Sequence, residues 1–307
     1  MTTVEQSVHL VERAAQRLRM REAADGLDLL AGAAPVSSKP VSGAEPVPVP
    51  AQAAAPRGEA ADQARETITA RQLERAGMVS QMTERNRVWE EFRIAQSQLT
   101  LNTPAAGFGT NTGANLCLVT SALPGEGKTF CAINLAATIA RYSTSKVLLV
   151  DLDSKPKCLS SMLGVPNERF GVWDLAASPT SNPAKTVIAT ELSKVFFVPI
   201  GAHHEYESLP IGPAIRELGR HFSDYFIILD ASPCLCSSTP STLAGLVGQI
   251  VFVVEAERTQ RTEIEAALAL IETCPNVALM LNKIQSSASY TFGAYHNGSH
   301  YATARTS

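Results

Sequence analysis

The sequence predicts an α/β protein built on a mostly parallel β-sheet with helices on both faces. Six short apolar runs, each the length of a buried strand, recur between residues 115 and 282. The segments between them carry apolar residues at helical spacing, such as Ile264, Ala267, Leu268 and Ile271. Strands that are apolar on both faces and alternate with helices are typical of a parallel sheet between two helical layers.

Composition supports this class and limits the partners. The chain has 307 residues, 45% of them hydrophobic, and can therefore bury a large core. Its net charge of −3 provides no positive field for a nucleic-acid backbone, so no nucleic-acid partner is expected. Scattered cysteines without a CxxC pair fit a reducing compartment, and no apolar stretch is long enough to span a membrane. We expect a cytoplasmic protein.

The first element in chain order is a helix within residues 1–30. Apolar residues recur there at intervals of three and four positions, at Val4, Val8, Val11, Ala15 and Leu18. This stripe could dock on the rest of the chain or on a partner protein. Residues 31–65 contain no Ile, Leu or aromatic residue and are rich in Ala and Pro, so they are predicted to form a disordered linker.

A domain over residues 66–286 follows and opens with a helical arm. The arm is predicted from about residue 66 to residue 101, with one apolar face formed by Val88, Phe92, Ala95 and Leu99. The six strands are then predicted at residues 115–120, 146–151, 194–200, 224–230, 249–255 and 276–282. Ligands of such sheets bind at the carboxyl ends of the strands, where a site is therefore expected.

The stretch "ALPGEGKTF", residues 122–130, lies between the first strand and the next helix. Its spacing fits a relaxed phosphate-binding loop (P-loop) with Ala122 in place of the first glycine. The two glycines let the backbone approach an anion, and successive N–H groups with the helix N-terminus would surround a phosphate. A glycine-rich turn without a ligand is the alternative. The motif predicts a P-loop NTPase fold with these nucleotide-binding residues: Pro124, Gly125, Glu126, Gly127, Lys128, Thr129 and Phe130.

Three aspartates stand where predicted strands end. Asp151 ends the second strand, Asp153 lies two residues further on, and Asp230 ends the fourth. A lone aspartate at such a position is usually a turn former or a helix cap. Because parallel strands end at one edge of the sheet, we expect all three beside the P-loop, where carboxylates bind Mg²⁺ and act as a general base.

Together these segments resemble the bacterial tyrosine kinases, which use a modified P-loop ATPase fold with Walker A, A′ and B motifs. The matching stretches are "SALPGEGKT", "VLLVDLDS" and "FIILDASP", with "NRVWEEFR" before the domain. More narrowly, the chain resembles the exopolysaccharide-linked tyrosine autokinases of exosortase systems. The resemblance covers residues 66–285 well and the N-terminal helix loosely.

The resemblance implies roles for single residues. Lys128 and Thr129 would hold the phosphates and Mg²⁺ of ATP, and Asp230 would complete the metal shell. Asp151 and Asp153 would supply a water-mediated metal contact and the base that takes a tyrosine proton, with Asp151 favoured as the base. Asn282 would meet the adenine edge, with an ordinary turn residue as the alternative.

Residues 287–307 are predicted to be a flexible tail that carries the autophosphorylation sites Tyr290, Tyr295 and Tyr301. A mobile tail can deliver a phenol to the site of another protomer, although these aromatic residues could also be incidental. The resemblance further implies a homo-oligomer. It also implies recruitment to the inner face of the cell membrane by an activator, a membrane-embedded polysaccharide chain-length or co-polymerase protein.

Three departures from the family pattern matter. Gln96 stands where the family's oligomerisation pattern, matched by Glu90 and Arg93, has a basic residue. Lys155 follows the paired aspartates where the family carries Arg. Leu123 replaces the second lysine of partition and septum-positioning ATPases, which argues against that branch. The alternative to an autokinase is a nucleotide-dependent switch or binding module that docks on the membrane partner without phosphorylating tyrosine.

Overall fold

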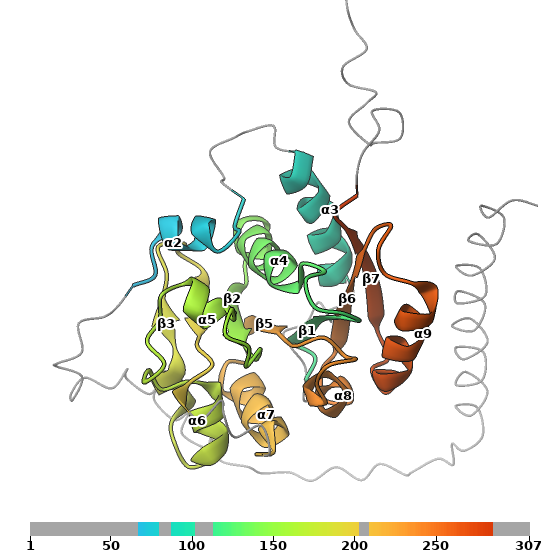
Figure 1. Ribbon diagram of the computed structural model, residues 1–307. Helices are drawn as coiled ribbons and strands as arrows, with labels where there is room; N and C mark the ends of the chain where they lie inside the picture. Colours follow the sequence, from blue (N-terminus) through green and yellow to red (C-terminus); the bar gives the residue numbers. More distant parts are fainter. Residues whose placement is uncertain (1–66, 80–86, 102–112, 203–208, 285–307) are drawn as a thin grey trace, which may run out of the picture. The chain divides into compact units, whose positions relative to one another are not determined.

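The computed structural model describes residues 67–79, 87–101, 113–202 and 209–284 (Figure 1). Contacts between Cα atoms divide the chain between Glu59 and Ala60, and every described residue belongs to the second part. The predicted N-terminal helix, the linker and the tyrosine-containing tail all lie outside the described residues.

The fold centres on a seven-stranded sheet with the order β3-β4-β2-β5-β1-β6-β7. Neighbouring strands are parallel, except that β3 and β4 are antiparallel. The six predicted strands are confirmed, and the two-residue β3 is an addition that is too short to leave an apolar pattern. The strands are β1 (Leu116–Ser121), β2 (Lys146–Asp151), β3 (Ile188–Ala189), β4 (Val195–Val198), β5 (Tyr225–Asp230), β6 (Gln249–Glu255) and β7 (Val277–Asn282).

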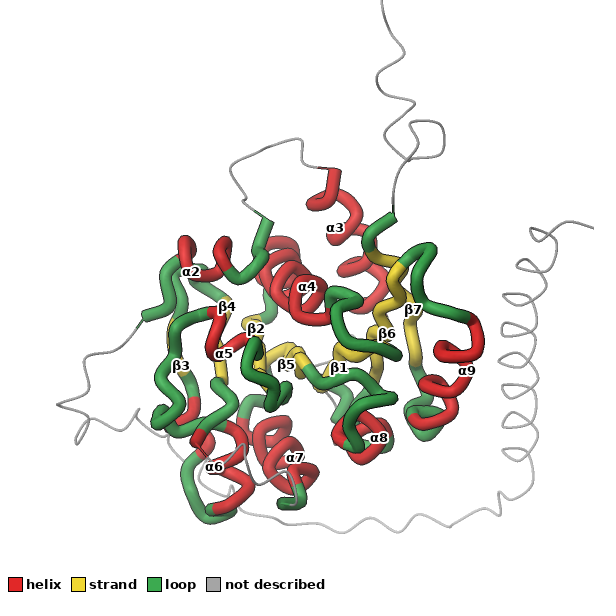
Figure 2. The backbone as a smooth tube through the Cα atoms, in the orientation of Figure 1, coloured by secondary structure: helices red, strands yellow, loops and turns green. Residues whose placement is uncertain are grey.

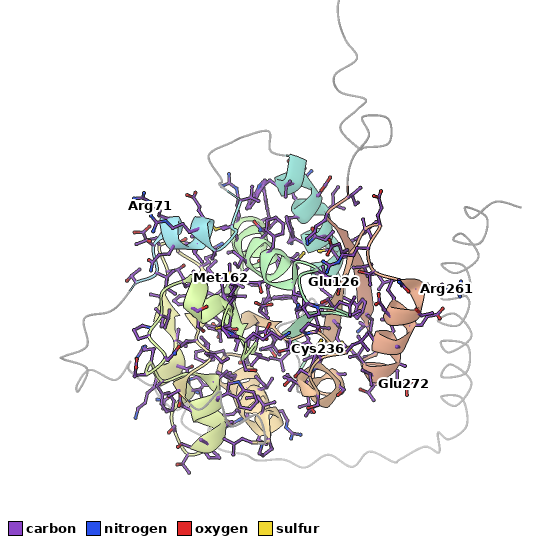
Figure 3. The ribbon with its side chains drawn as sticks, in the orientation of Figure 1. Arg71, Glu126, Met162, Cys236, Arg261 and Glu272 are labelled. Carbon is purple, nitrogen blue, oxygen red and sulfur yellow. The ribbon has the colours of Figure 1, made fainter. Side chains whose placement is uncertain are left out.

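Helices cover both faces of the sheet, as predicted (Figures 1 and 2). Side chains of β1 alternate between two buried clusters: Leu116 and Leu118 face the cluster with α7 and α8, and Cys117 and Val119 face the cluster with α3 and α4. No helix in the described part of the chain is long and apolar enough to cross a membrane. The helices are α2 (Ala70–Arg75), α3 (Arg87–Leu101), α4 (Lys128–Tyr142), α5 (Leu159–Met162), α6 (Val172–Ala177), the 3₁₀ turn η1 (Pro183–Thr186), α7 (Ile211–His221), α8 (Thr239–Ala244) and α9 (Arg261–Leu270).

The prediction of a helical arm over residues 66–101 was wrong in one respect, because the arm is not one continuous helix. Helix α2 ends at Arg75, and Gly77 follows with a φ of 112°, a conformation that stops a helix. The second helix, α3, packs against α4 through the predicted apolar face. Phe92 is buried there, with its ring centroid 5.7 Å from that of Phe130.

Candidate active site

The loop that joins β1 to α4 has the backbone shape expected of an anion-binding loop. Gly125 and Gly127 have φ angles of 85° and 96°, in the left-handed region that favours glycine. Gly127 immediately precedes α4, so the free N–H groups of the first helical turn lie at this loop. A Cβ atom on Gly127 would lie 2.1 Å from Nδ2 of Asn282, which leaves no room for a side chain.

The sheet brings the strand-end aspartates to this loop. Strand β5 lies between β2 and β1, and its Asp230 is in register with Asp151 on one side and Val119 on the other. Asp153 follows two residues after the end of β2. The expected edge is therefore present: the carboxyl ends of β1, β2 and β5 carry the P-loop and all three aspartates.

Asp151 is fully buried and has hydrogen bonds to both carboxylate oxygens. Its Oδ2 accepts from the backbone N–H and from the hydroxyl of Ser160, both at 2.6 Å, and its Oδ1 accepts from the N–H of Asp153 at 3.2 Å. Burial raises the pKa of Asp151 to about 6, and the bonds from Ser160 act in the opposite direction. Asp151 therefore fastens α5 to the end of β2.

Asp230 is buried without a hydrogen-bond partner. Neither of its carboxylate oxygens receives a hydrogen bond within the described part of the chain. Burial and the neighbouring Asp151 raise the pKa of Asp230 to about 8, although Thr129 and Lys128 lie close enough to lower it. Buried carboxylates almost always have hydrogen-bond or ion-pair partners. These oxygens have no hydrogen-bond donor among the described residues and are therefore suited to coordinate a cation.

Asp153 and Lys128 complete the polar cluster. Asp153 is partly exposed, and its Oδ1 accepts a hydrogen bond from the hydroxyl of Ser232 at 2.8 Å. Lys128 is the first residue of α4 and is buried; burial lowers the pKa of Lys128, while the charges of Asp230 and Asp153 raise it. The ammonium group thus lies within the field of two carboxylates at the mouth of the P-loop.

These residues fit a magnesium ion that arrives with a nucleotide. Mg²⁺ is usually held by one or two carboxylates together with phosphate oxygens and water. The open oxygens of Asp230, with Asp153 and the hydroxyl of Thr129 nearby, match that donor set. Among the described residues, there is no group of three or more His, Cys, Asp or Glu side chains that could hold a metal ion.

Asn282 lies beside the P-loop, and its Nδ2 donates a hydrogen bond to the carbonyl of Glu126 at 2.8 Å. Its contact with adenine stays a prediction. Pro124 and Gly125 are exposed at the tip of the loop, and the ring of Phe130 packs on Phe92. The predicted phosphoacceptors lie outside the described residues: Tyr290, Tyr295 and Tyr301.

Sequence reasoning missed four polar residues that the structure brings to the site. Ser160 and Ser232 bind the aspartates, and Thr259 and Lys283 bind the P-loop itself. The serines follow strand-end aspartates closely in sequence, which could have suggested them. Thr259 and Lys283 left no such local signal, because their partners lie more than a hundred residues away.

The sequence has several relatives. No protein-family model matches the chain. Over 166 residues it is 30% identical to a protein of Ralstonia nicotianae named "Putative tyrosine-protein kinase EpsB", covering 53% of this chain and 22% of that one. It is 31% identical over 148 residues to the succinoglycan biosynthesis transport protein ExoP of Rhizobium meliloti, covering 46% of this chain and 18% of ExoP. The chromosome-partitioning ATPase Soj of Thermus thermophilus is 37% identical over 148 residues, covering 48% of this chain and 57% of Soj.

The fold also has a solved counterpart. The kinase domain of the Escherichia coli tyrosine kinase ETK matches with a TM-score of 0.57 at 21% identity, over 69% of this chain and 81% of that domain. Fold and loop together define a P-loop NTPase-type protein. Within that class, the chain is similar in sequence to a protein named as a putative tyrosine-protein kinase and to one named for succinoglycan biosynthesis and transport. It spans only about a fifth of the length of the first such relatives, 22% in the case of EpsB.

Proposed function

We propose that this chain is an ATP-dependent protein-tyrosine autokinase that regulates exopolysaccharide biosynthesis or export. One observation carries the proposal: Lys128, Asp153 and the unpartnered Asp230 meet at the P-loop. A buried carboxylate without a partner next to a buried lysine is costly unless a ligand uses it. A magnesium-bound triphosphate is the ligand that this set of groups suits best.

In this proposal the amides of the P-loop and Lys128 bind the phosphates of ATP, and Thr129 and Asp230 hold Mg²⁺. When bound, Mg²⁺ would neutralise charge on the phosphate oxygens. The tyrosine oxygen forms a bond to the γ-phosphorus as the bond to the leaving ADP oxygen breaks, and Lys128 stabilises the charge that develops on the phosphoryl oxygens. The phenolic proton passes to an aspartate.

We assign the role of base to Asp153. The sequence favoured Asp151, but both oxygens of Asp151 are hydrogen-bonded and the residue is fully buried. Asp153 is partly exposed, and only its Oδ1 is engaged, by Ser232. A base has to reach the proton that it removes, so Asp153 suits the role better. In this assignment Asp153 acts on tyrosine and is not a direct magnesium ligand.

The acceptors in this proposal are Tyr290, Tyr295 and Tyr301, phosphorylated in trans within a homo-oligomer. The activator is a membrane-embedded polysaccharide chain-length protein that recruits the chain to the cytoplasmic face of the membrane. ExoP, a relative in sequence, is named for succinoglycan biosynthesis and transport, which supports this setting. It does not identify the partner of this chain.

The test is phosphotyrosine formation by the purified full chain with Mg-ATP. We expect K128M to abolish it and D153N to reduce it far more than the exposed control D224N does. To test transfer in trans, the Tyr290→Phe, Tyr295→Phe, Tyr301→Phe variant serves as donor and K128M as acceptor; phosphotyrosine should appear on K128M. If ATP binds but no phosphotyrosine forms, even with the partner's cytoplasmic segment added, the chain is a nucleotide-dependent switch instead.

A further inference from the structure

The P-loop carries an acidic side chain, Glu126, that is turned away from the anion site. Glu126 is only 1% exposed. Its Oε2 accepts a hydrogen bond from the N–H of Leu123 at 2.6 Å, and its Oε1 accepts one from the hydroxyl of Thr259. A carboxylate that faced the phosphates would repel them, so the bond from Thr259 keeps an unfavourable charge out of the site.

Two successive residues at the end of β7 hold carbonyl groups of the same loop. Lys283 Nζ donates to the carbonyl of Gly125 at 2.7 Å, and Asn282 Nδ2 donates to the carbonyl of Glu126 at 2.8 Å. In a trans peptide the C=O and the following N–H point in opposite directions. Holding these two carbonyls toward β7 therefore turns the N–H groups of Glu126 and Gly127 to the opposite side, as an anion-binding nest requires.

The residues that make these bonds are themselves fixed by a second set of interactions. The Thr259 hydroxyl accepts from the N–H of Glu255 at 3.2 Å, which orients its own proton toward Glu126. The carboxylate of Glu255 lies 2.9 Å from Arg258 and 3.2 Å from Lys283. One acidic group therefore links the turn after β6 to the turn after β7.

Backbone strain marks the same two turns. Within the described residues, the non-glycine residues with positive φ are Glu257, at 63°, and Lys283, at 58°. One lies in the turn after β6 and the other directly after β7. Non-glycine residues adopt this conformation when the surrounding structure holds them there, often at functional sites.

We propose that Thr259 and Lys283, together with Asn282, are positioning residues that act through Glu126 and Gly125 to hold the P-loop amides ready for phosphate. This inference rests on the proposed function, since it needs a nucleotide at the loop. It assigns them no contact with reacting atoms. Their loss should weaken nucleotide binding and raise the KM for ATP, with little change in kcat at saturating ATP.

The test measures Mg-ADP binding to the full chain by calorimetry for T259V and K283M. Each variant removes a hydrogen bond to a P-loop acceptor, and we expect Kd to rise roughly tenfold. T259S and K283R should restore most of the affinity, because they keep the donor. Asn282 variants are unsuitable, because its predicted contact with adenine would confound them.

Matched controls are available in this chain. The hydroxyl of Thr190 also accepts a hydrogen bond from a backbone N–H, that of Leu192, at 3.2 Å. It donates one to the carbonyl of Val195 at 2.8 Å. Lys194 Nζ donates to the carbonyl of Ser143 at 2.9 Å. T190V and K194M should therefore leave Mg-ADP affinity unchanged.

The possible outcomes separate this inference from the proposed function. A wild-type chain that binds no Mg-ADP overturns the proposed function. Wild-type affinity in folded T259V and K283M, or equal losses in T190V and K194M, overturns the positioning role while the nucleotide site stands. The side chain of Lys283 is 45% exposed, so K283M should fold even if T259V does not.

Discussion

At the scale of single residues, Asp230 is a buried carboxylate that lowers the stability of the fold. A carboxyl group that is fully buried and unpaired destabilises the fold when it is ionised, and its pKa of about 8 expresses that cost. Asp151 is equally buried but is hydrogen-bonded by Ser160, and its pKa is raised only to about 6. The hydrogen bonds to Asp151 lower its pKa, while the charge of Asp151 further raises the pKa of Asp230.

The raised pKa of Asp230 predicts a pH-dependent stability. The folded chain binds the proton of the Asp230 carboxyl group more tightly than the unfolded chain does. The stabilisation from this proton is therefore complete below the pKa of the unfolded chain, 3.8, and is lost as the pH rises toward about 8. Asp151, with a pKa of about 6, still titrates above pH 6, but it is present in both proteins, so the difference between D230N and wild type from pH 6 to 8 isolates Asp230. Urea unfolding without Mg²⁺ should show D230N about 1–3 kcal/mol more stable than wild type at pH 8.

The control for this prediction is D224N, because the side chain of Asp224 is 69% exposed. It should keep the wild-type slope of stability against pH. A D230N variant with the same slope as wild type between pH 6 and 8 would contradict the prediction.

At the scale of elements, α3 depends on α4 for its place. Phe92 packs on Phe130, and Nε1 of Trp89 donates a hydrogen bond to the hydroxyl of Tyr142 at 3.1 Å. Glu90 and Arg93, from the predicted oligomerisation pattern, form an exposed ion pair within the helix at 2.8 Å, and Gln96 is buried. Exposed pairs of this kind contribute little to stability, so apolar contacts hold the arm.

Phe92→Ala should therefore destabilise the chain by about 3–5 kcal/mol, because it removes a buried aromatic ring from the α3–α4 contact. Ile94 is in the same helix but is 39% exposed, and Ile94→Ala should change stability by less than about 0.5 kcal/mol. Denaturant titration followed by circular dichroism measures both. Similar losses in the two variants would show that α3 is not held by its apolar face.

At the scale of the whole molecule, the proposed nucleotide site joins elements from across the sheet. The P-loop follows β1, the aspartates lie at or just after the ends of β2 and β5, and the residues that hold the loop lie at or after the ends of β6 and β7. A ligand that contacts all of these strand ends stabilises the folded state as a unit. Binding should therefore be visible as a shift in the thermal unfolding of the entire domain.

Mg-ADP at a hundred times its Kd should add about 2.7 kcal/mol of stability and raise the thermal midpoint by roughly 5–10 °C. K128M should lose most of this shift, because in the proposed function the buried ammonium group binds the phosphates. Differential scanning calorimetry with and without Mg²⁺ measures the effect. An unchanged midpoint in the wild-type chain would count against a nucleotide site.

Much of this protein follows from the sequence alone. The six main strands, the two covered faces and the glycine loop before α4 were all predicted, because apolar periodicity and the loop motif are local properties of the chain. The ending of β1, β2 and β5 at one edge followed from parallel pairing. The break at Gly77 was missed, because apolar positions at helical spacing continue across it.

Only the tertiary structure decided how the site is held. Ser160 satisfies Asp151, while Asp230 is left without a partner, although both aspartates end similar strands. The bonds from Thr259, Asn282 and Lys283 to the P-loop join residues 133, 156 and 158 positions apart. The order of strands in the sheet creates such neighbours, and local apolar periodicity does not specify that order.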